Sequence, residues 1–116
     1  MLKLKFPKTI LIGDTNFKVK TDKKRNGGEF YYWDDDEKKK NKKKGGCIII
    51  GTCLLNINPI EVLTTIIHEL KEVIQVEQCV RFVIPRSSSS YLFNYNHEQH
   101  TDFCSRLAGL LSQFIK

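Results

Sequence analysis

Three side chains that can bind or activate a metal ion lie close together on one predicted helix. His68, Glu69 and Glu72 belong to the stretch Thr64–Glu72. At about 100° per residue, Glu72 falls roughly 40° from His68, so the imidazole and the carboxylate stand one turn apart and can share one ion. Zinc accepts both kinds of ligand, and a catalytic zinc keeps three protein ligands and one position open to water. The spacing therefore predicts part of a zinc site, which needs a third ligand from elsewhere.

The order of these residues indicates what each would do. In H-E-x-x-H helices the two histidines bind zinc, and the glutamate after the first histidine is the general base. Here Glu72 replaces the second histidine, which gives H-E-x-x-E and makes Glu69 the candidate catalytic base. The alternative is an ordinary amphipathic helix whose polar face carries His and Glu, because the motif is short and Glu is common on helices.

The residues around the motif predict the helix that carries it. Asn58 can cap the helix, Pro59 suits its first position, and Glu61 can reach back to the cap. The helix should run to about Gln75 or Gln78, with Gln75 on the polar side that carries the motif. The apolar side consists of Val62, Leu63, Ile66, Ile67, Leu70, Val73 and Ile74.

A second amphipathic helix, His97 to Ile115, carries the candidate third ligands. With His100 at zero, the apolar residues fall within about ±80° and His97 lies at about 60°, so we expect both histidines to face inward. One histidine on an apolar arc is usually a core residue, but two of them together with a His/Glu pair favour a shared ion. Cys104 lies on the same helix, and its thiolate is a further candidate zinc donor.

The remaining segments predict an α+β fold. Short strands are expected at Thr9–Ile12, Phe17–Lys20, Glu29–Trp33 and Cys47–Ile50. The last of these is apolar on both faces and should be an inner strand. We expect a small antiparallel sheet packed against the motif helix and the C-terminal helix. Residues 1–116 should form a single domain with a flexible charged loop at about 34–46.

The net charge of +6 comes from one segment of the chain. Asp34–Glu37 is acidic, and six lysines follow between Lys38 and Lys44; without them, Lys plus Arg and Asp plus Glu are equal at 13 each. Such a run is more often a solvated loop than a phosphate-binding arm. No recognition helix or stacking module accompanies it, so we do not expect nucleic acid as the main partner.

The cysteines and the N-terminus bear on the compartment. Cys47, Cys53, Cys79 and Cys104 form no C-x-x-C pair, and the N-terminus lacks the features of a secretion signal. We therefore expect reduced, buried cysteines in a cytoplasmic protein. No apolar stretch is long enough for a membrane span, so we expect no membrane partner.

Taken together, these segments resemble small zincin-like proteins of bacteriophages and bacteria. The resemblance runs from Ile10 to Phe114 and rests on Ile12-Gly13, on Thr65-Ile66-Ile67-His68-Glu69-Leu70-Lys71-Glu72 and on Leu92-Phe93-Asn94-Tyr95-Asn96-His97. It implies a minimal metallopeptidase core in a single zincin-like domain. The relatives place an aromatic and a small polar residue before a ligand histidine, which favours His97, whereas the centre of the apolar arc favours His100. We predict His97 as the third ligand, with His100 as its rival.

The sequence thus predicts a zinc-dependent hydrolase in the cytoplasm, most simply a metallopeptidase that acts on a peptide or protein. If the chain is phage-encoded, that cytoplasm is the host's. His68, Glu72 and His97 would bind Zn²⁺, and Glu69 would be the general base. Two alternatives stay open: a non-catalytic interaction protein whose metal fastens the two helices, and a nucleic-acid-associated protein that uses Lys38–Lys44.

Overall fold

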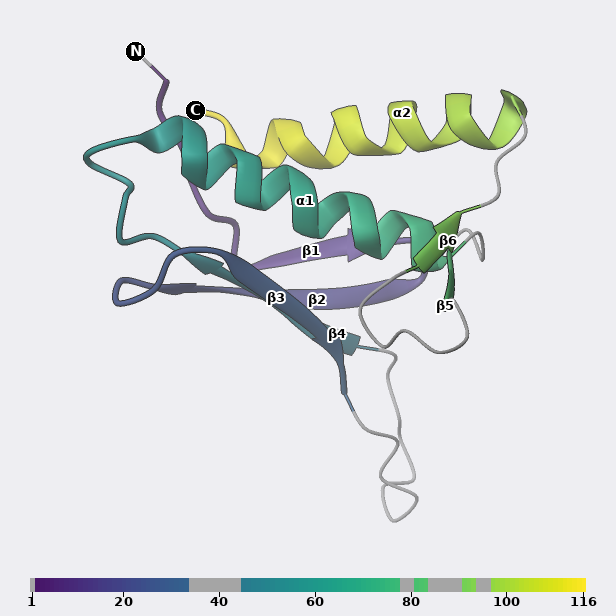
Figure 1. Ribbon diagram of the computed structural model, residues 1–116, viewed down its shortest axis with the longest axis horizontal. Coiled ribbons are helices and arrows are strands. Elements are labelled where there is room, and N and C mark those ends of the chain that lie inside the picture. Colours follow the sequence, from purple (N-terminus) through teal and green to yellow (C-terminus); the bar gives the residue numbers. More distant parts are fainter. Residues whose placement is uncertain (1, 34–44, 78–80, 84–90, 94–96) are drawn as a thin grey trace.

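One helix lies across a face of a four-stranded sheet, and a second helix packs on the first (Figure 1). The computed structural model describes residues 2–33, 45–77, 81–83, 91–93 and 97–116. The elements are β1 (Thr9–Ile12), β2 (Thr15–Asp22), β3 (Gly28–Tyr32), β4 (Gly45–Gly51), α1 (Pro59–Glu77), β5 (Arg81–Val83), β6 (Tyr91–Phe93), α2 (His97–Leu111) and the 3-10 turn η1 (Ser112–Phe114). The predicted α+β class is confirmed, and α1 starts and ends where the sequence placed it.

The sheet is mixed, so the expectation of an antiparallel sheet is wrong. Its strand order is β1-β2-β4-β3, with β4 antiparallel to β3 and parallel to β2. The chain leaves β2, turns into β3, and then returns as β4 between the two. Because β2 and β3 run in opposite directions, a strand inserted between them must be parallel to one of them. The prediction that β4 is an inner strand is confirmed, and β3 is an edge strand.

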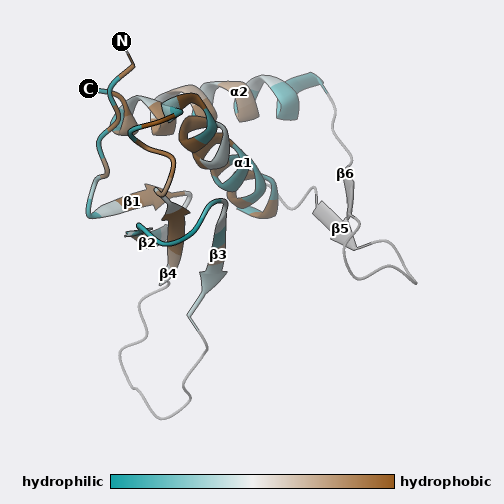
Figure 2. Cartoon of the chain, turned by 60° about the vertical axis from the view of Figure 1, so that its left-hand side comes forward, coloured by the Kyte–Doolittle hydropathy of each residue, from teal (hydrophilic) through white to brown (hydrophobic). Residues whose placement is uncertain are grey.

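The core lies between the sheet and the helices. Side chains at every second position of the strands point toward α1, because successive side chains of a strand alternate between its two faces. The hydrophobic parts of β4 and α1 are brown in Figure 2. Burial of one such side chain contributes about 1.5–3 kcal/mol. The buried residues are Ile10, Ile12, Phe17, Ile48 and Ile50 from the sheet, Val62, Ile66, Leu70, Val73 and Ile74 from α1, and Leu4, Phe103 and Phe114.

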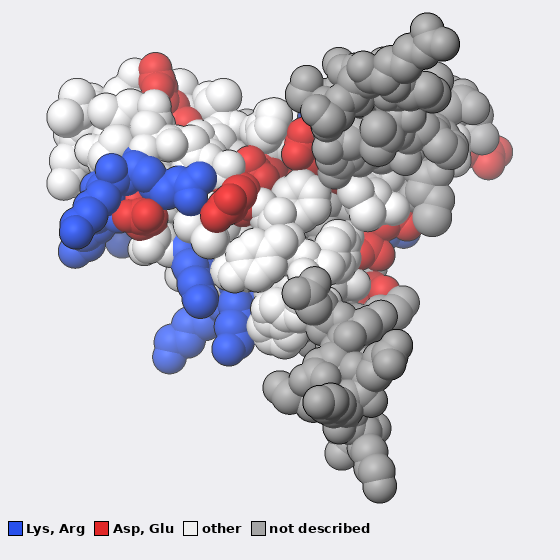
Figure 3. Space-filling view, turned by 60° about the horizontal axis from the view of Figure 1, so that its bottom comes forward, with Lys and Arg blue, Asp and Glu red and all other residues white. Residues whose placement is uncertain are grey.

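The opposite face of the sheet is open. No described helix or strand covers it, and Figure 3 brings it forward. The short β5–β6 pair forms a separate sheet. The terminal segments pair with each other, since the Lys5 amide donates to the Phe114 carbonyl at 2.8 Å and the Lys116 amide to the Lys3 carbonyl at 3.0 Å. None of the described helices is long and apolar enough to cross a membrane.

The helix α2 packs differently from the prediction. His97 and His100 are both exposed, so the expectation that they face inward is wrong. Of the residues on α2, only Phe103 is buried, while Leu107, Leu110 and Leu111 are partly buried. The first turns of α2 extend beyond the end of α1 (Figure 1). The apolar periodicity gave the right face for the later turns, but it could not indicate that the partner helix ends before the first ones.

Two smaller expectations also change. Cys47 is buried as expected, whereas Cys53 and Cys104 are exposed free thiols, and Cys79 lies outside the described residues. Gly45 and Gly46 belong to β4 and are buried, so the predicted charged loop at about 34–46 ends before them. Residues 34–44 of that loop lie outside the described residues.

Candidate functional site

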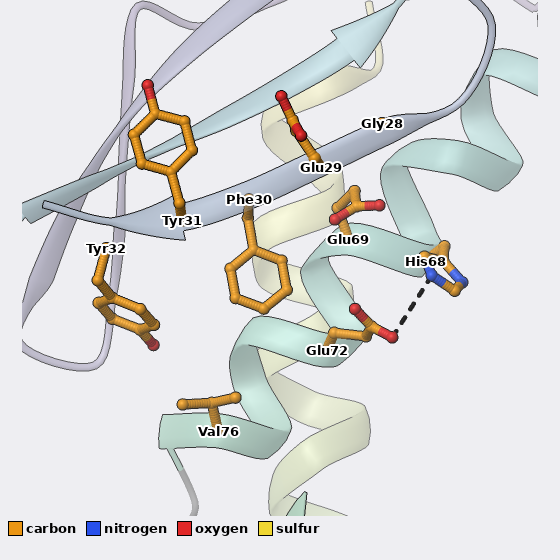
Figure 4. A pocket seen from close by; sticks show the side chains of 9 residues that line it. All are labelled: Gly28, Glu29, Phe30, Tyr31, Tyr32, His68, Glu69, Glu72 and Val76. Atoms are coloured by element: carbon orange, nitrogen blue, oxygen red, sulfur yellow. Dashed lines mark ion pairs between the residues drawn. The ribbon is translucent and has the colours of Figure 1, made fainter. Parts of the chain in front are cut away.

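A cleft of about 460 Å³ lies between the edge strand β3 and the polar side of α1. Among the described residues, its lining comes from these two elements: Gly28, Glu29, Phe30, Tyr31 and Tyr32 on β3, and His68, Glu69, Glu72 and Val76 on α1 (Figure 4). All three motif residues are therefore in one place, and the strand supplies a mainly aromatic wall opposite them. The cleft has the room that a small ligand or an extended segment would need.

The His68 and Glu72 side chains form a pair at the mouth of the cleft. His68 Nε2 and Glu72 Oε1 are 3.5 Å apart, and the side chains are 64% and 26% exposed. Two ligands that bind one tetrahedral zinc at about 2.0–2.2 Å are separated by roughly 3.4 Å. The observed distance matches that separation, and the exposure leaves a path for an ion to enter.

Glu69 lies deeper than this pair. The residue is only 4% exposed although it ends in a carboxyl group. Burial raises the pKa of the Glu69 carboxyl; the neighbouring His68 opposes the rise, while Glu72 and Glu29 add to it and Arg25 lowers it. A carboxylate whose pKa is shifted toward neutrality accepts a proton more readily at physiological pH. The position and the direction of the shift both suit a general base.

Gly28 explains why the glutamate can be buried at all. A Cβ atom at this position would lie 2.9 Å from Thr65 Cγ2, 3.2 Å from Glu69 Cγ and 2.7 Å from the Ile49 carbonyl oxygen. Only glycine lets the strand approach the helix this closely. The adjacent glycines Gly27 and Gly28 are typical of a turn, and nothing in the sequence indicates that Gly28 sets the distance between β3 and α1.

A second contact joins the end of α1 to the sheet. Glu77 Oε1, at the end of α1, accepts a hydrogen bond from the Tyr32 hydroxyl at 2.9 Å and from Thr15 Oγ1 at 3.2 Å. These bonds tie the last turn of the helix to β3 and β2. Sequence reasoning missed this role of Glu77, because the spacing of 45 residues between Tyr32 and Glu77 leaves no local signal.

The structure does not bring the predicted third ligands to the pair. His97 and His100 are on α2, where His100 Nε2 is 3.8 Å from Cys104 Sγ. Among the described residues, no group of three His, Cys, Asp or Glu side chains could hold a metal ion. The site thus fits a divalent ion in part: it offers two donors at a suitable distance and a buried carboxylate beside them. The choice between His97 and His100 as third ligand stays a prediction.

Comparison with known proteins adds no relative to this description. The chain matches no family model, no curated protein and no solved structure. What the cleft does must be inferred from its own residues.

Proposed function

We propose that the cleft between α1 and β3 is the active site of a zinc-dependent hydrolase, most simply a zincin-like metallopeptidase in the cytoplasm. The observation that carries the proposal is the position of Glu69, 4% exposed, beside a His68–Glu72 pair whose donor atoms are 3.5 Å apart. A buried acid next to a candidate metal-binding pair in an open cleft is the arrangement that hydrolysis by activated water requires.

A purely structural role accounts poorly for Glu69. Burial of a carboxylate costs free energy unless the charge is paired or hydrogen-bonded. None of the described residues donates a hydrogen bond to the Glu69 carboxylate, and its closest charged neighbours include two further carboxylates. Perturbed groups of this kind cluster at functional sites. A carboxylate whose charged form is disfavoured by its position is more readily explained by catalysis than by packing.

The proposed roles follow from the positions. His68 and Glu72 would hold the ion, with His97 as the proposed third ligand and His100 as its rival. Bound zinc would supply a Lewis acid and would lower the pKa of a water molecule. Glu69 would take a proton from the attacking water and return it to the leaving amine. Phe30 and Tyr32, whose side chains lie on the α1 side of β3 (Figure 4), would line the position of a peptide or protein substrate.

Two measurements on matched variants test this function. Metal analysis of the protein purified without chelator should give about one zinc per chain, and cleavage of a fluorogenic peptide library should depend on it. Glu69→Gln should keep the metal and lose activity by about 10²- to 10⁴-fold, the usual contribution of a general base. Glu61→Gln makes the same chemical change at an exposed position of α1 and should leave activity within about twofold. Full activity in Glu69→Gln, or a preparation free of metal, would overturn the proposal.

A further inference from the structure

The uncovered face of the sheet carries a compact set of lysine and aromatic side chains. On β2, Phe17 points inward, and Lys18 and Lys20 are exposed on the other face. Lys18 lies opposite Cys47 of β4, and Cys47 lies opposite Tyr31 of β3. Residues that are directly opposite each other on neighbouring strands share a face, so Lys18 and Tyr31 are on the same face of the sheet. Trp33 continues this face beyond β3, because its amide donates to the Gly45 carbonyl at 2.9 Å.

Both aromatic rings are exposed, and the Trp33 ring lies close to the backbone of the sheet. Tyr31 is 44% exposed and Trp33 is 46% exposed. A Cβ atom on Gly45 would lie 2.6 Å from two atoms of the Trp33 ring, so glycine lets the indole lie close to the backbone of β4. Exposed aromatic rings present a flat apolar surface to solvent, which is what stacking of a planar ligand requires.

The lysines beside these rings form no ion pair within the part of the chain that the structure describes. Lys18 Nζ is 5.5 Å from the centre of the Trp33 ring, and no described carboxylate forms an ion pair with Lys18 or Lys20. Glu29, on the same face, is paired with Arg25 at 3.3 Å. In the space-filling view, blue side chains gather beside a mainly uncharged area on this side of the molecule (Figure 3).

Protection of a sheet edge does not explain these lysines. Charged side chains commonly guard an exposed edge strand against pairing with another chain. Lys18 and Lys20 belong to β2, which lies between β1 and β4. A protein partner fits less well too, because lysine is depleted at the centres of protein–protein interfaces. Positive charge next to exposed rings instead matches a ligand with phosphates and planar bases.

We propose that this face binds single-stranded nucleic acid, with bases stacking on Tyr31 and Trp33 and phosphates contacting Lys18 and Lys20. Side chains two residues apart on a strand are separated by roughly 6.5–7 Å. Stacked bases in a duplex strand follow one another at about 3.4 Å. Two bases that each cover one ring must therefore be unstacked from each other, which a single strand permits and a duplex does not. Lysine is flexible enough for Lys18 to turn from the ring to a phosphate.

The lysines at Lys38–Lys44 are not part of this face. They lie outside the described residues, and a run of like charge can attract any polyanion without stacking. The proposal therefore needs a signal that charge alone cannot give. The chain provides one, because Trp33 is its only tryptophan and its emission reports directly on the proposed stacking position.

The test is a tryptophan fluorescence titration with unstructured oligo(dT) and oligo(rU) of about 12 nucleotides, within the usual range of site sizes. We expect either single strand to quench Trp33 emission, with an affinity that falls as salt rises. A duplex of equal length and inorganic polyphosphate should cause little quenching. Equal quenching by the duplex, or an absence of quenching by both single strands, would overturn the proposal.

Variants separate stacking from charge. Tyr31→Leu should weaken oligonucleotide binding by about 5- to 150-fold, the range measured for loss of one base–aromatic stack, while Tyr31→Phe keeps the ring and should bind within about threefold. Lys18→Glu with Lys20→Glu should weaken binding by at least about tenfold and reduce the salt slope by about 1.4. Lys71→Glu with Lys116→Glu has the same net charge at exposed positions elsewhere and should bind much more tightly than the first pair.

One last variant tests whether the lysines at Lys38–Lys44 contribute to oligonucleotide binding. Replacement of Lys38–Lys44 by Gly and Ser should keep the quenching of Trp33 and its dependence on Tyr31. Thermal melting of every variant establishes that it is folded. If only this replacement abolishes binding, while the Tyr31 and lysine variants bind like the parent protein, the run binds polyanions by itself and the open sheet face has no such function.

Discussion

The helices α1 and α2 each carry a histidine with a second metal-binding side chain four residues later, yet only one of the pairs lies in a site. On α1, His68 Nε2 is 3.5 Å from Glu72 Oε1; on α2, His100 Nε2 is 3.8 Å from Cys104 Sγ. The first pair lines a cleft closed by β3. The second pair is exposed on a helix that extends beyond its partner. Helical spacing sets the distance between donors in both, and the opposing strand makes the difference.

The strand changes what the α1 residues can do. It buries Glu69, and burial is the main cause of the raised pKa of that carboxyl. It also supplies a wall against which a substrate can lie. The α2 pair has no described wall and no buried acid beside it. Identical spacing thus gives a candidate active site on one helix and two solvent-exposed side chains on the other.

The largest expected effect concerns metal affinity. His68→Ala should weaken zinc binding by more than about 100-fold, because even partners outside the ligand shell contribute 10- to 100-fold. His100→Ala should change it by less than about threefold. Competition with a chromophoric chelator measures both affinities under the same conditions. Loss of zinc in His100→Ala together with retention of zinc in His68→Ala would contradict the conclusion that the pair on α1, and not the pair on α2, belongs to the site. Loss of zinc in His97→Ala would identify the third ligand on α2 and require its first turn to approach α1.

The sequence predicted those parts of this picture that depend on local pattern. The bounds of α1, the inner position of β4 and the pairing of His68 with Glu72 follow from capping residues, apolar runs and helical period. The parallel pairing of β2 with β4 did not follow, because it joins segments that are far apart in the chain. Nor did the exposure of His100, since periodicity identifies an apolar face and not the length of the partner that covers it.

The sequence also could not predict which residues on the polar side of α1 are buried. Gln75 was placed on that side, yet the residue is only 2% exposed and its Oε1 finds no hydrogen-bond partner among the described residues. Glu69 was identified as the catalytic candidate from the motif, but its burial depends on β3 approaching at Gly28. Which polar residues of a helix are buried is decided by the neighbouring elements, and a helical wheel carries no information about them.

The next effect tests the close approach of β3. Gly28→Ala should lower the free energy of unfolding by about 1–3 kcal/mol, because its Cβ would lie 2.9 Å from Thr65 Cγ2. Gly109→Ala is the matched control. It lies in α2 with nothing within 4 Å of its added Cβ, so the same change should stabilise the protein by about 0.4–1 kcal/mol. Urea unfolding of both variants measures the two values, and equal signs would contradict the packing described for Gly28.

The third effect concerns the pH dependence that burial gives to Glu69. A raised pKa means that the folded protein holds this proton more tightly than the unfolded chain does. Stability from this group is therefore complete below the ordinary Glu pKa of about 4.3 and is lost as the pH rises through the raised value. Glu69→Gln removes the charge, so it should melt at a higher temperature than the parent at pH 7–8, with a gain that shrinks toward pH 4. Melting curves across this range measure it.

The outcome of that series also separates catalysis from packing. A variant that melts higher and has lost activity indicates a residue kept for function at a cost in stability. Glu61→Gln, at an exposed position in the first turn of α1, should change stability by less than about 1 kcal/mol. A lower melting temperature for Glu69→Gln at pH 7–8 would show that the carboxylate is stabilised in the folded protein, contrary to its pKa shift.

The smallest effect is expected at the far end of the cleft wall. Tyr32→Phe removes the hydroxyl that donates to Glu77 at 2.9 Å and leaves the bond from Thr15 in place. Tyr32 is 38% exposed, so water can replace the lost donor, and the cost should be about 0.5–1.5 kcal/mol in urea unfolding. Glu77 is about two and a half helical turns from His68. Zinc affinity should therefore stay within about twofold of the parent. If Tyr32→Phe instead weakens zinc binding as much as loss of a ligand does, the position of α1 over β3 is set by this hydrogen bond rather than by the contact at Gly28.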